Sequence, residues 1–337
     1  MSETSEKNLA IPLPIVKRKM LPGPDGLPAG VQYGIISIRK SGRTERMVII
    51  DYFNTVNPGF WLSRLSQCDW TGGQYLHQLL KEGRFHALCG EKARVLLLTD
   101  GTKLVSFCTY AERDDTPDTD LTPWMGFVYT APDYRGRRLM GRLIAEVKAL
   151  AREDGYDTLW ISTGETGLYE KYGAGYVQDA KDMRGNDSRI YRMDTYGFYG
   201  WKTADVPARI PDYPGIRTPR DLYNALWHLW KRETCAPRMQ EDWSGENRTL
   251  GQCSITAFLA QDIFGGLVYG VPLDEGGYHC FNVVGDTWFD LTSEQFGGRE
   301  LQYSLKWEQL RHDHFLKEEK RARYEALRDL LKEYTNR

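Results

Sequence analysis

The stretch Tyr134-Arg-Gly-Arg-Arg-Leu-Met-Gly-Arg-Leu-Ile144 decides how the first half of the chain is expected to fold. It follows a strand-like segment, residues 124–130, and leads into apolar residues at helical spacing, which are Leu139, Leu143, Val147 and Leu150. A helix is therefore expected to begin where the Gly/Arg segment ends. Its free N–H groups and the positive end of its dipole would lie beside four guanidinium groups, those of Arg135, Arg137, Arg138 and Arg142. The stretch thus predicts a seat for a pyrophosphate group.

Strand-like segments surround this turn. Residues 95–99, 104–109 and 124–130 read as three strands, and Asp100-Gly101 supplies a hairpin turn between the first two. After the helix, the short apolar run 158–162 is typical of a buried parallel strand, and a second helix is expected to begin near Glu165. Earlier helices are expected near 58–68 and 73–82. The pattern favours an α/β fold, although an ordinary strand, turn and helix with a solvated basic start stays open as the alternative for the turn itself.

The turn resembles the acetyl-coenzyme A signature of the GNAT (Gcn5-related) N-acetyltransferase superfamily, which is Arg or Gln, two variable residues, Gly, one variable residue, then Gly or Ala. Aligned from Arg135, the signature glycines fall on Arg138 and Met140. Gly136 and Pro132 fit the extended form of the signature. Downstream, Leu168-Tyr-Glu-Lys-Tyr-Gly173 is similar to the superfamily's Leu-Tyr-Glu-Lys-Leu-Gly-Phe.

The resemblance implies a mixed twisted sheet flanked by helices, with acetyl-CoA as co-substrate and a small-molecule amine or a peptide as acceptor. The expected cofactor-binding residues are Val128, Thr130, Arg135, Gly136, Arg137, Arg138, Leu139, Met140 and Gly141. By the same match, Tyr169 takes the place of the tyrosine that protonates the departing thiolate, a role suited to a phenol with a pKa of about 10. Glu112, Asp114 and Glu165 are candidate general bases, and the sequence selects none of them.

Composition bounds the class of protein. The chain has 337 residues, 41% apolar and 12% aromatic, which is enough for a large core and suggests two domains. A formal net charge of -2 gives no reason to expect nucleic acid as a partner. No apolar run is long enough for a membrane span, and the polar start lacks the order of a signal peptide, so a cytoplasmic protein is expected. The six cysteines lack a metal-ligand spacing and are expected to be reduced.

Two proline-rich stretches divide the chain. They predict an extended segment at 1–32, an acetyltransferase-like domain at 33–200 whose first strand begins at Tyr33, an interdomain linker at 201–219, and an α+β domain at 220–337. The charged tail, 316–334, carries leucines at helical spacing and is expected to be an amphipathic helix packed on its own domain.

The last domain carries a second set of chemically active residues. Cys253 lies at the start of a helical period that ends at Gly265-Gly266, where the helix dipole stabilises a thiolate. His279 and Asp290 follow on two strand-like segments joined by a turn at Gly285-Asp286. Cys, His and Asp in this order resemble transglutaminase-like enzymes. His279 would withdraw the thiol proton, Asp290 would hold the imidazole, and Gln252 could donate to an oxyanion.

This region also resembles a family of small uncharacterised bacterial proteins with Gly-Gln-Cys, a later His and Asp-Leu-Thr, here Gly251 to Cys253, His279 and Asp290 to Thr292. The resemblance brings no activity. A buried structural cysteine beside a satisfied core histidine is the alternative to a reactive pair, and a metal site is not expected. Three readings therefore stay open: an acetyltransferase fused to a possible cysteine hydrolase or acyl-transfer domain, a non-catalytic binding protein, and a cysteine hydrolase whose first domain only recognises substrate.

Overall fold

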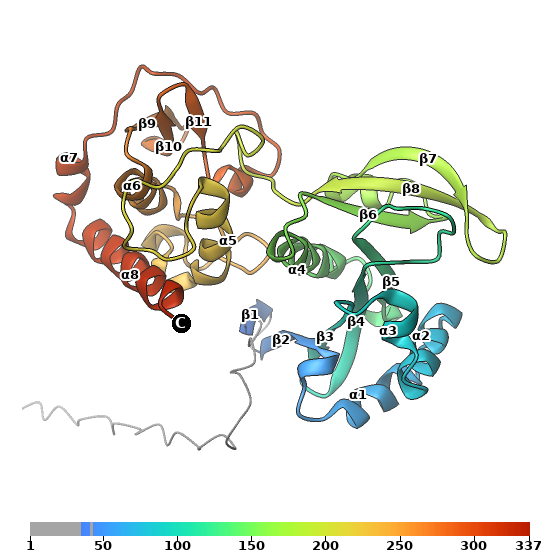
Figure 1. Ribbon diagram of the computed structural model, residues 1–337. Coiled ribbons are helices and arrows are strands. Elements are labelled where there is room, and N and C mark those ends of the chain that lie inside the picture. Colours follow the sequence, from blue (N-terminus) through green and yellow to red (C-terminus); the bar gives the residue numbers. More distant parts are fainter. Residues whose placement is uncertain (1–34, 41–42) are drawn as a thin grey trace, which may run out of the picture. The chain divides into compact units, whose positions relative to one another are not determined.

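The computed structural model describes residues 35–40 and 43–337, with side chains from Met47 onward (Figure 1). All of these residues belong to one compact unit, Tyr33–Arg337. The extended segment predicted for residues 1–32, and the start of the first strand at Tyr33, lie outside the described residues. Within the described part of the chain, no helix is long and apolar enough to cross a membrane.

An eight-stranded sheet forms the first half of the described chain, in the order β1-β2-β3-β4-β5-β6-β8-β7. Its strands are β1 (Ile35–Lys40), β2 (Arg43–Asp51), β3 (Arg94–Asp100), β4 (Lys103–Ala111), β5 (Trp124–Thr130), β6 (Thr158–Thr163), β7 (Gly175–Lys181) and β8 (Asp187–Asp194). Neighbouring strands are antiparallel, except that β5 and β6 are parallel. The strands predicted at 95–99, 104–109, 124–130 and 158–162 are confirmed, as is the turn at Asp100-Gly101.

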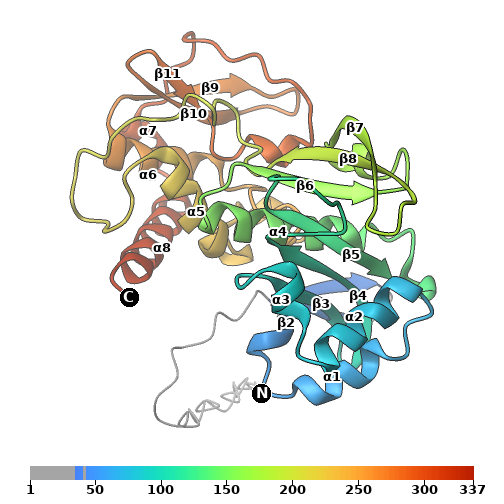
Figure 2. The same cartoon turned by 45° about the vertical axis from the view of Figure 1, so that its right-hand side comes forward.

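Helices cover both faces of this sheet (Figures 1 and 2). Side chains alternate along β3, so that Val95 and Leu97 pack with α1 (Pro58–Leu65), α2 (Thr71–Lys81) and α3 (Phe85–Cys89) on one face. Leu96 and Leu98 pack with α4 (Leu139–Glu153) on the other. The predicted start of α4 at the end of the Gly/Arg segment is confirmed.

The helix predicted to begin near Glu165 is wrong. The backbone from Gly164 to Leu168 is irregular, and only a short 3-10 helix follows, Tyr169–Tyr172. Two observations explain the difference. Thr163 accepts a hydrogen bond from the Glu165 N–H at 3.0 Å, which holds a turn, and Gly167 has a φ of 71° that a right-handed helix does not contain.

The second half of the chain is an α+β arrangement. Its helices are α5 (Pro219–Leu229), α6 (Cys253–Phe264), α7 (Arg311–Phe315) and α8 (Glu318–Thr335), and its strands β9 (Leu267–Pro272), β10 (Tyr278–Val284) and β11 (Thr287–Phe289) form an antiparallel sheet in the order β11-β10-β9. The amphipathic tail helix is confirmed as α8. It packs on α5 and α6 and buries Leu327 and Leu331 completely.

The proline-rich stretch at 201–219 is packed onto the second half and does not behave as a spacer. Ala204, Tyr213 and Ile216 are buried in the same apolar core as α5 and α6. The Arg209 N–H also donates to the carbonyl of Ile263 at 2.7 Å, the second-last residue of α6. The many prolines in this stretch, which suggested a linker, instead fix an irregular strap whose apolar side chains complete a core.

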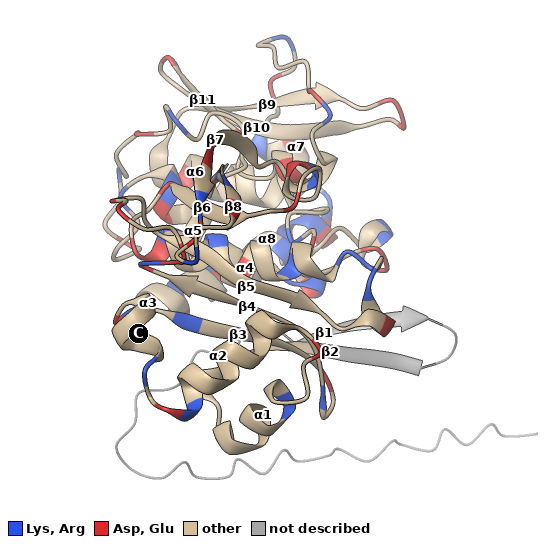
Figure 3. Cartoon of the chain, turned by 90° about the vertical axis from the view of Figure 1, so that its right-hand side faces the viewer, with Lys and Arg blue, Asp and Glu red and all other residues tan. Residues whose placement is uncertain are grey.

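Charged residues of α4 join the two halves. Glu146 forms a buried ion pair with Arg248, which lies before α6 in the second half. Arg152, also buried, donates to Asn224 of α5 at 3.0 Å and lies 5.0 Å from the ring centre of Trp227. Because buried charges need partners, these contacts tie α4 to the second half. Elsewhere basic and acidic residues are mixed along both halves (Figure 3).

Candidate active sites

A cavity of about 1220 Å³ lies where β5 and β6 separate. The two strands share the pair Trp124↔Trp160 and no further Cα pair in their register, so β5 beyond Trp124 presents an unpaired edge toward β6. Residues 125–130 of β5 and 162–165 at the end of β6 line the cavity. Its volume of about 1220 Å³ exceeds the roughly 300–1,000 Å³ typical of ligand sites.

The predicted backbone seat at Val128 and Thr130 lines this cavity. The register between β4 and β5 shifts between Phe107 and Thr109, and Phe127 opposite has a φ of 48°. A bulge of this kind turns backbone groups out of the ladder. The structure therefore places both residues on the cavity wall, in the bulged part of β5.

The Gly/Arg turn forms another wall of the cavity. Arg138, at the first glycine position of the signature, has a φ of 56° and a ψ of 25°, so it adopts the left-handed conformation that glycine normally supplies. Its side chain is exposed, and it lines the cavity with Arg135 and Gly136. Arg135 donates from Nε to the Thr130 carbonyl at 3.0 Å, which ties the turn to β5. Arg138 thus holds a left-handed backbone without being a glycine.

The first residues of α4 hold their side chains away from solvent. Leu139 and Met140 are buried in the core beneath the sheet, so Met140 does not fill the cavity that it borders. No side chain caps the N-terminus of α4. The N–H of Gly141, one of the predicted phosphate donors, already donates to the Arg138 carbonyl at 3.0 Å, which leaves the N–H groups of Leu139 and Met140 as the more available donors.

Two arginines of the stretch do not point at the expected seat. Arg142 is 2% exposed, lies 3.6 Å from a carboxylate oxygen of Glu246, and donates to the carbonyl of Met47 on β2 at 3.4 Å. Arg137 donates to the carbonyl of Asp133 at 3.2 Å and is not among the cavity residues. The expectation that four guanidinium groups lie beside the free N–H groups of the helix start is therefore wrong for Arg142, because helical spacing turns its side chain under the turn.

Tyr169 is buried at the start of its 3-10 helix and lines the cavity. Burial, followed by the charges of nearby Cys108, Asp114 and Glu165, raises the pKa of its phenol above the ordinary value. The hydroxyl therefore stays protonated at neutral pH and can act as a proton donor.

Among the three carboxylates that the sequence offers as bases, Asp114 lines the cavity and is partly buried. Burial, and then the charge of Asp115, raise the pKa of Asp114 to about 7, although part of its surface is open to the cavity. Its carboxylate packs over Gly126 of β5, where a Cβ atom would come within 2.7 Å of its oxygen. By contrast, Glu112 is absent from the cavity wall and accepts a hydrogen bond from the backbone of Lys92 at 3.1 Å, while Glu165 is exposed.

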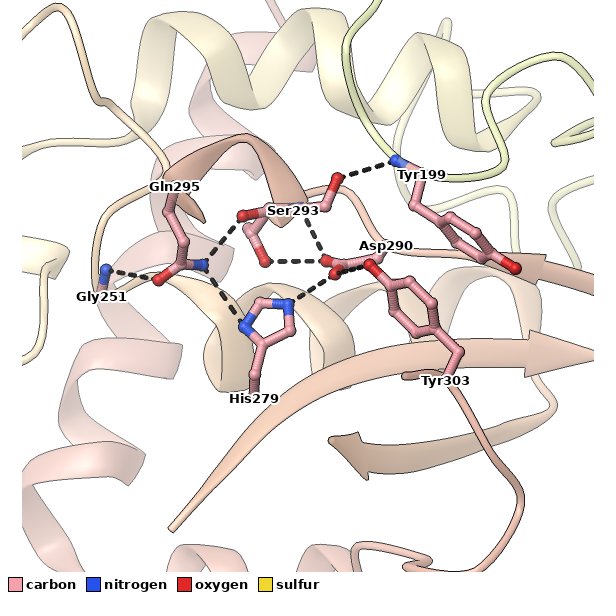
Figure 4. A network of polar contacts seen from close by, with 8 residues as sticks. Tyr199, Gly251, His279, Asp290, Ser293, Gln295 and Tyr303 are labelled. Carbon is pink, nitrogen blue, oxygen red and sulfur yellow. Dashed lines mark hydrogen bonds and ion pairs between the residues drawn. The ribbon is translucent and has the colours of Figure 1, made fainter. Parts of the chain in front are cut away.

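The second half brings His279 and Asp290 together (Figure 4). The two side chains meet at 2.5 Å between Nε2 and Oδ2, and both are almost completely buried. Asp290 is held in turn by the Tyr303 hydroxyl at 2.9 Å and by the backbone N–H and hydroxyl of Thr292, both at 3.0 Å. Asp290 follows directly after β11, so the predicted order of helix start, strand and next strand is close to what the structure shows.

Cys253 lies at the first residue of α6 and is partly exposed. Hydrogen bonding from Cys280 and, despite burial, the hydrogen bond and charge of His279 hold the pKa of the Cys253 thiol well below its ordinary value. Although burial lowers the pKa of His279, the contact with Asp290 and the neighbouring thiolate raise it to about 10. Together these shifts favour a thiolate and imidazolium pair.

Gln252 does not occupy the oxyanion position that the sequence suggests. It is completely buried, and its Nε2 donates to the carbonyl of Lys231 at 2.9 Å. Gln295, which sequence reasoning missed, contacts His279 Nδ1 at 3.4 Å and accepts from the Gly251 N–H at 3.4 Å (Figure 4). In the sequence, Gln295 is linked to the predicted site only by lying three residues after Thr292, the last residue of the Asp-Leu-Thr motif. In the described residues, no group of His, Cys, Asp and Glu suits a metal ion.

Comparison with known protein families agrees with both halves. Residues 62–174 match the acetyltransferase (GNAT) family. The chain carries a GNAT-family domain. Residues 218–336 match the YunG protein family, so a YunG-family domain follows it. The uncharacterised protein YunG of Bacillus subtilis (strain 168) is 35% identical over 71 residues, which are 21% of this chain and 56% of that protein. The chain thus spans little more than half of this relative.

Solved structures similar to the first domain are GNAT-type acetyltransferases. An acetyltransferase from Streptococcus agalactiae is 20% identical (TM-score 0.34, 44% of this chain, 98% of that one). A GNAT family acetyltransferase from Elizabethkingia anophelis with acetyl-CoA bound is 16% identical (TM-score 0.32, 44% and 97%). The spermidine N-acetyltransferase SpeG from Vibrio cholerae is 10% identical (TM-score 0.32, 44% and 94%). The GNAT family uses acetyl-CoA.

Proposed function

We propose that the GNAT domain transfers an acetyl group from acetyl-CoA to the amine of a small molecule or a peptide. The observation that carries this proposal is the single cavity that joins the unpaired edge of β5, the Gly/Arg turn, Tyr169 and Asp114. Acetyl-CoA would supply the activated thioester. The Leu139 and Met140 N–H groups and the Arg135 and Arg138 guanidinium groups fit its phosphates, because the turn keeps a glycine-like backbone and an open face.

Each remaining group has a role in this proposal. The amine of the acceptor is cationic at neutral pH, and Asp114 removes its proton. The N–H groups at Val128 and Thr130 stabilise the negative charge that develops on the carbonyl oxygen. Tyr169 donates its proton to the sulfur that leaves. Aromatic residues and carboxylates on the remaining cavity wall, among them Trp70, Tyr75, Phe127, Asp69 and Asp115, suit an ammonium ion.

Tyr169→Phe tests the acetyltransferase assignment. We expect the variant to bind acetyl-CoA with the wild-type Kd, measured by calorimetry, and to lose about 10²-fold in kcat with an amine acceptor. The loss is at the low end for a general acid because a thiolate is already a fair leaving group. Tyr176→Phe, which changes an exposed tyrosine outside the cavity, serves as the matched control. A wild-type chain that shows no heat with acetyl-CoA would contradict the proposal.

The short contact between His279 and Asp290 favours a second function. We propose that the YunG domain is a cysteine-dependent hydrolase or acyl-transfer domain with Cys253 as nucleophile, His279 as its base and Asp290 as the group that orients the imidazole. Asp290 occupies Nε2 of His279, so Nδ1 is the nitrogen that would exchange the thiol proton. The buried Gln252 would hold the start of α6.

Selective alkylation tests this second function. We expect iodoacetamide to modify Cys253 first near neutral pH, since only the thiolate reacts and the pKa of Cys253 is lowered. Cys89 is the internal control, because burial raises its pKa to about 12. His279→Asn should slow the alkylation of Cys253, which peptide mass spectrometry measures. If Cys253 reacts no faster than Cys89, the cysteine is structural.

A further inference from the structure

Cys280 is a second thiol beside the proposed nucleophile, and neither proposed function uses it. It lies on β10 next to His279 and is 3% exposed, whereas Cys253 is partly exposed. Cys253 is within hydrogen-bonding reach of both the thiol and the backbone of Cys280. All six cysteines are free in the structure.

The packing of α6 on β10 explains why the two sulfurs meet. Asn282 donates from Nδ2 to the Ala257 carbonyl at 2.8 Å, which fixes the register of the strand against the helix. Cys280 lies two residues before Asn282 and therefore on the same face, about 6.7 Å along the strand. Cys253 lies four residues before Ala257, about 6 Å along the helix. Near-equal steps from this contact toward the N-terminal end of each element agree with the interaction between the two thiols.

We propose that Cys253 and Cys280 form a dithiol pair that a hydroperoxide oxidises to a reversible disulfide. In the first step the Cys253 thiolate attacks the O–O bond. The S–O bond forms, the O–O bond breaks, and the leaving oxygen takes a proton from the His279 imidazolium to become water or an alcohol. In the second step the sulfur of Cys280 attacks that of Cys253. The S–S bond forms and the sulfenic oxygen leaves as water with the Cys280 proton. The two thiols lose two electrons, and the hydroperoxide gains them.

The chemistry of the two thiols suits these steps. The partly exposed Cys253 is the one that a solute can reach, and its thiolate is the form that peroxides attack. The contact with Cys253 is the main cause of the raised pKa of Cys280, ahead of burial. Once Cys253 has become a neutral sulfenic acid, that contribution disappears, and Cys280 is freer to ionise and attack. The disulfide would protect Cys253 from irreversible oxidation.

This inference rests on a reactive Cys253 but needs no hydrolase activity. The full chain is treated with hydrogen peroxide, the remaining thiols are blocked with iodoacetamide, and the digest is analysed without reductant. We expect a cross-linked peptide joining Cys253 to Cys280, lighter by two hydrogen atoms than the separate peptides and lost on reduction. In Cys280→Ala, Cys253 should proceed to sulfinic acid that a thiol reductant does not reverse. Cys89→Ala, in the other domain, should behave as wild type.

The outcomes separate this inference from the proposed function. If the wild-type chain gives sulfinic acid at Cys253 while Cys280 stays open to alkylation, the dithiol pair is refuted and the nucleophile is not. If the disulfide forms but no hydrolase or transfer substrate is found, the dithiol pair stands alone. If peroxide leaves Cys253 as unreacted as Cys89, both ideas are wrong. The wild-type measurement needs no variant, so a Cys280→Ala chain that fails to fold does not prevent the test.

Discussion

Asp114→Asn is expected to lower kcat/KM with an amine acceptor by about 10³-fold at neutral pH. At pH 7 only about one in 10³ molecules of an amine with a pKa near 10 is neutral. A base that removes the proton from the cationic amine should therefore raise kcat/KM by about this factor. Burial raises the pKa of Asp114 to about 7, which matches the pH at which a general base works best. Asp120→Asn, an exposed aspartate of the same loop, is the control and should leave the rate unchanged.

The pH dependence gives a sharper test of the same residue. The base must be ionised, so wild-type kcat/KM should rise with pH and level off above an apparent pKa near 7. In Asp114→Asn only the neutral amine reacts, so kcat/KM should go on rising toward the pKa of the amine. Stability should show the opposite sign. The folded chain holds the Asp114 proton more tightly than the unfolded chain, whose reference pKa is 3.8, so the wild-type free energy of unfolding should fall between pH 4 and 7 relative to the variant. If kcat/KM of the variant also levels off near pH 7, Asp114 is excluded as the base.

The sequence predicted β3, β4, β5 and β6 of the large sheet, because their burial leaves a mark on composition, but it did not predict the inner strand β8. β3, β4 and β5 are covered on one or both faces and appear as apolar runs. β7 was not predicted. Nearly all of its side chains are exposed and it lies at the sheet edge, so its sequence carries no alternation between apolar and polar residues. β2 and β9 were also not predicted, although each pairs with a neighbour in the structure.

The candidate sites were predictable where a local rule applies. The helix start at Leu139 and the cysteine at the start of α6 follow from spacing along one element. The direction of Arg142, the burial of Gln252 and the choice of Asp114 among three carboxylates depend on how separate elements pack, which spacing does not encode. An arginine can stand at a glycine position only if the backbone φ there suits it. The structure gives this φ for Arg138, and the sequence does not.

Glu146→Leu is expected to destabilise the chain by about 3–5 kcal/mol, which is the usual cost of leaving one partner of a buried ion pair without its counter-charge. Arg248 would remain buried between the two halves, with hydrogen bonds only to the carbonyls of Trp227 at 3.0 Å and Gly245 at 3.4 Å. Urea unfolding measures the change. Glu153→Gln, which removes a partner of His228 from the exposed end of the same helix, should cost less than about 1 kcal/mol.

The double variant Glu146→Leu, Arg248→Met separates the role of charge from that of packing. If the cost in the single variant comes from an unpaired charge, removing both charges should restore most of the lost stability, since apolar side chains of similar volume replace buried ion pairs well. α4 begins at the proposed phosphate seat, and Arg248 lies five residues before Cys253. The ion pair of Glu146 and Arg248 therefore also links the two elements that carry the proposed sites. If the double variant is as unstable as the single variant, the contact between the halves depends on the shape of the two side chains and not on their charges. If the single variant is as stable as wild type, the two halves do not depend on this contact.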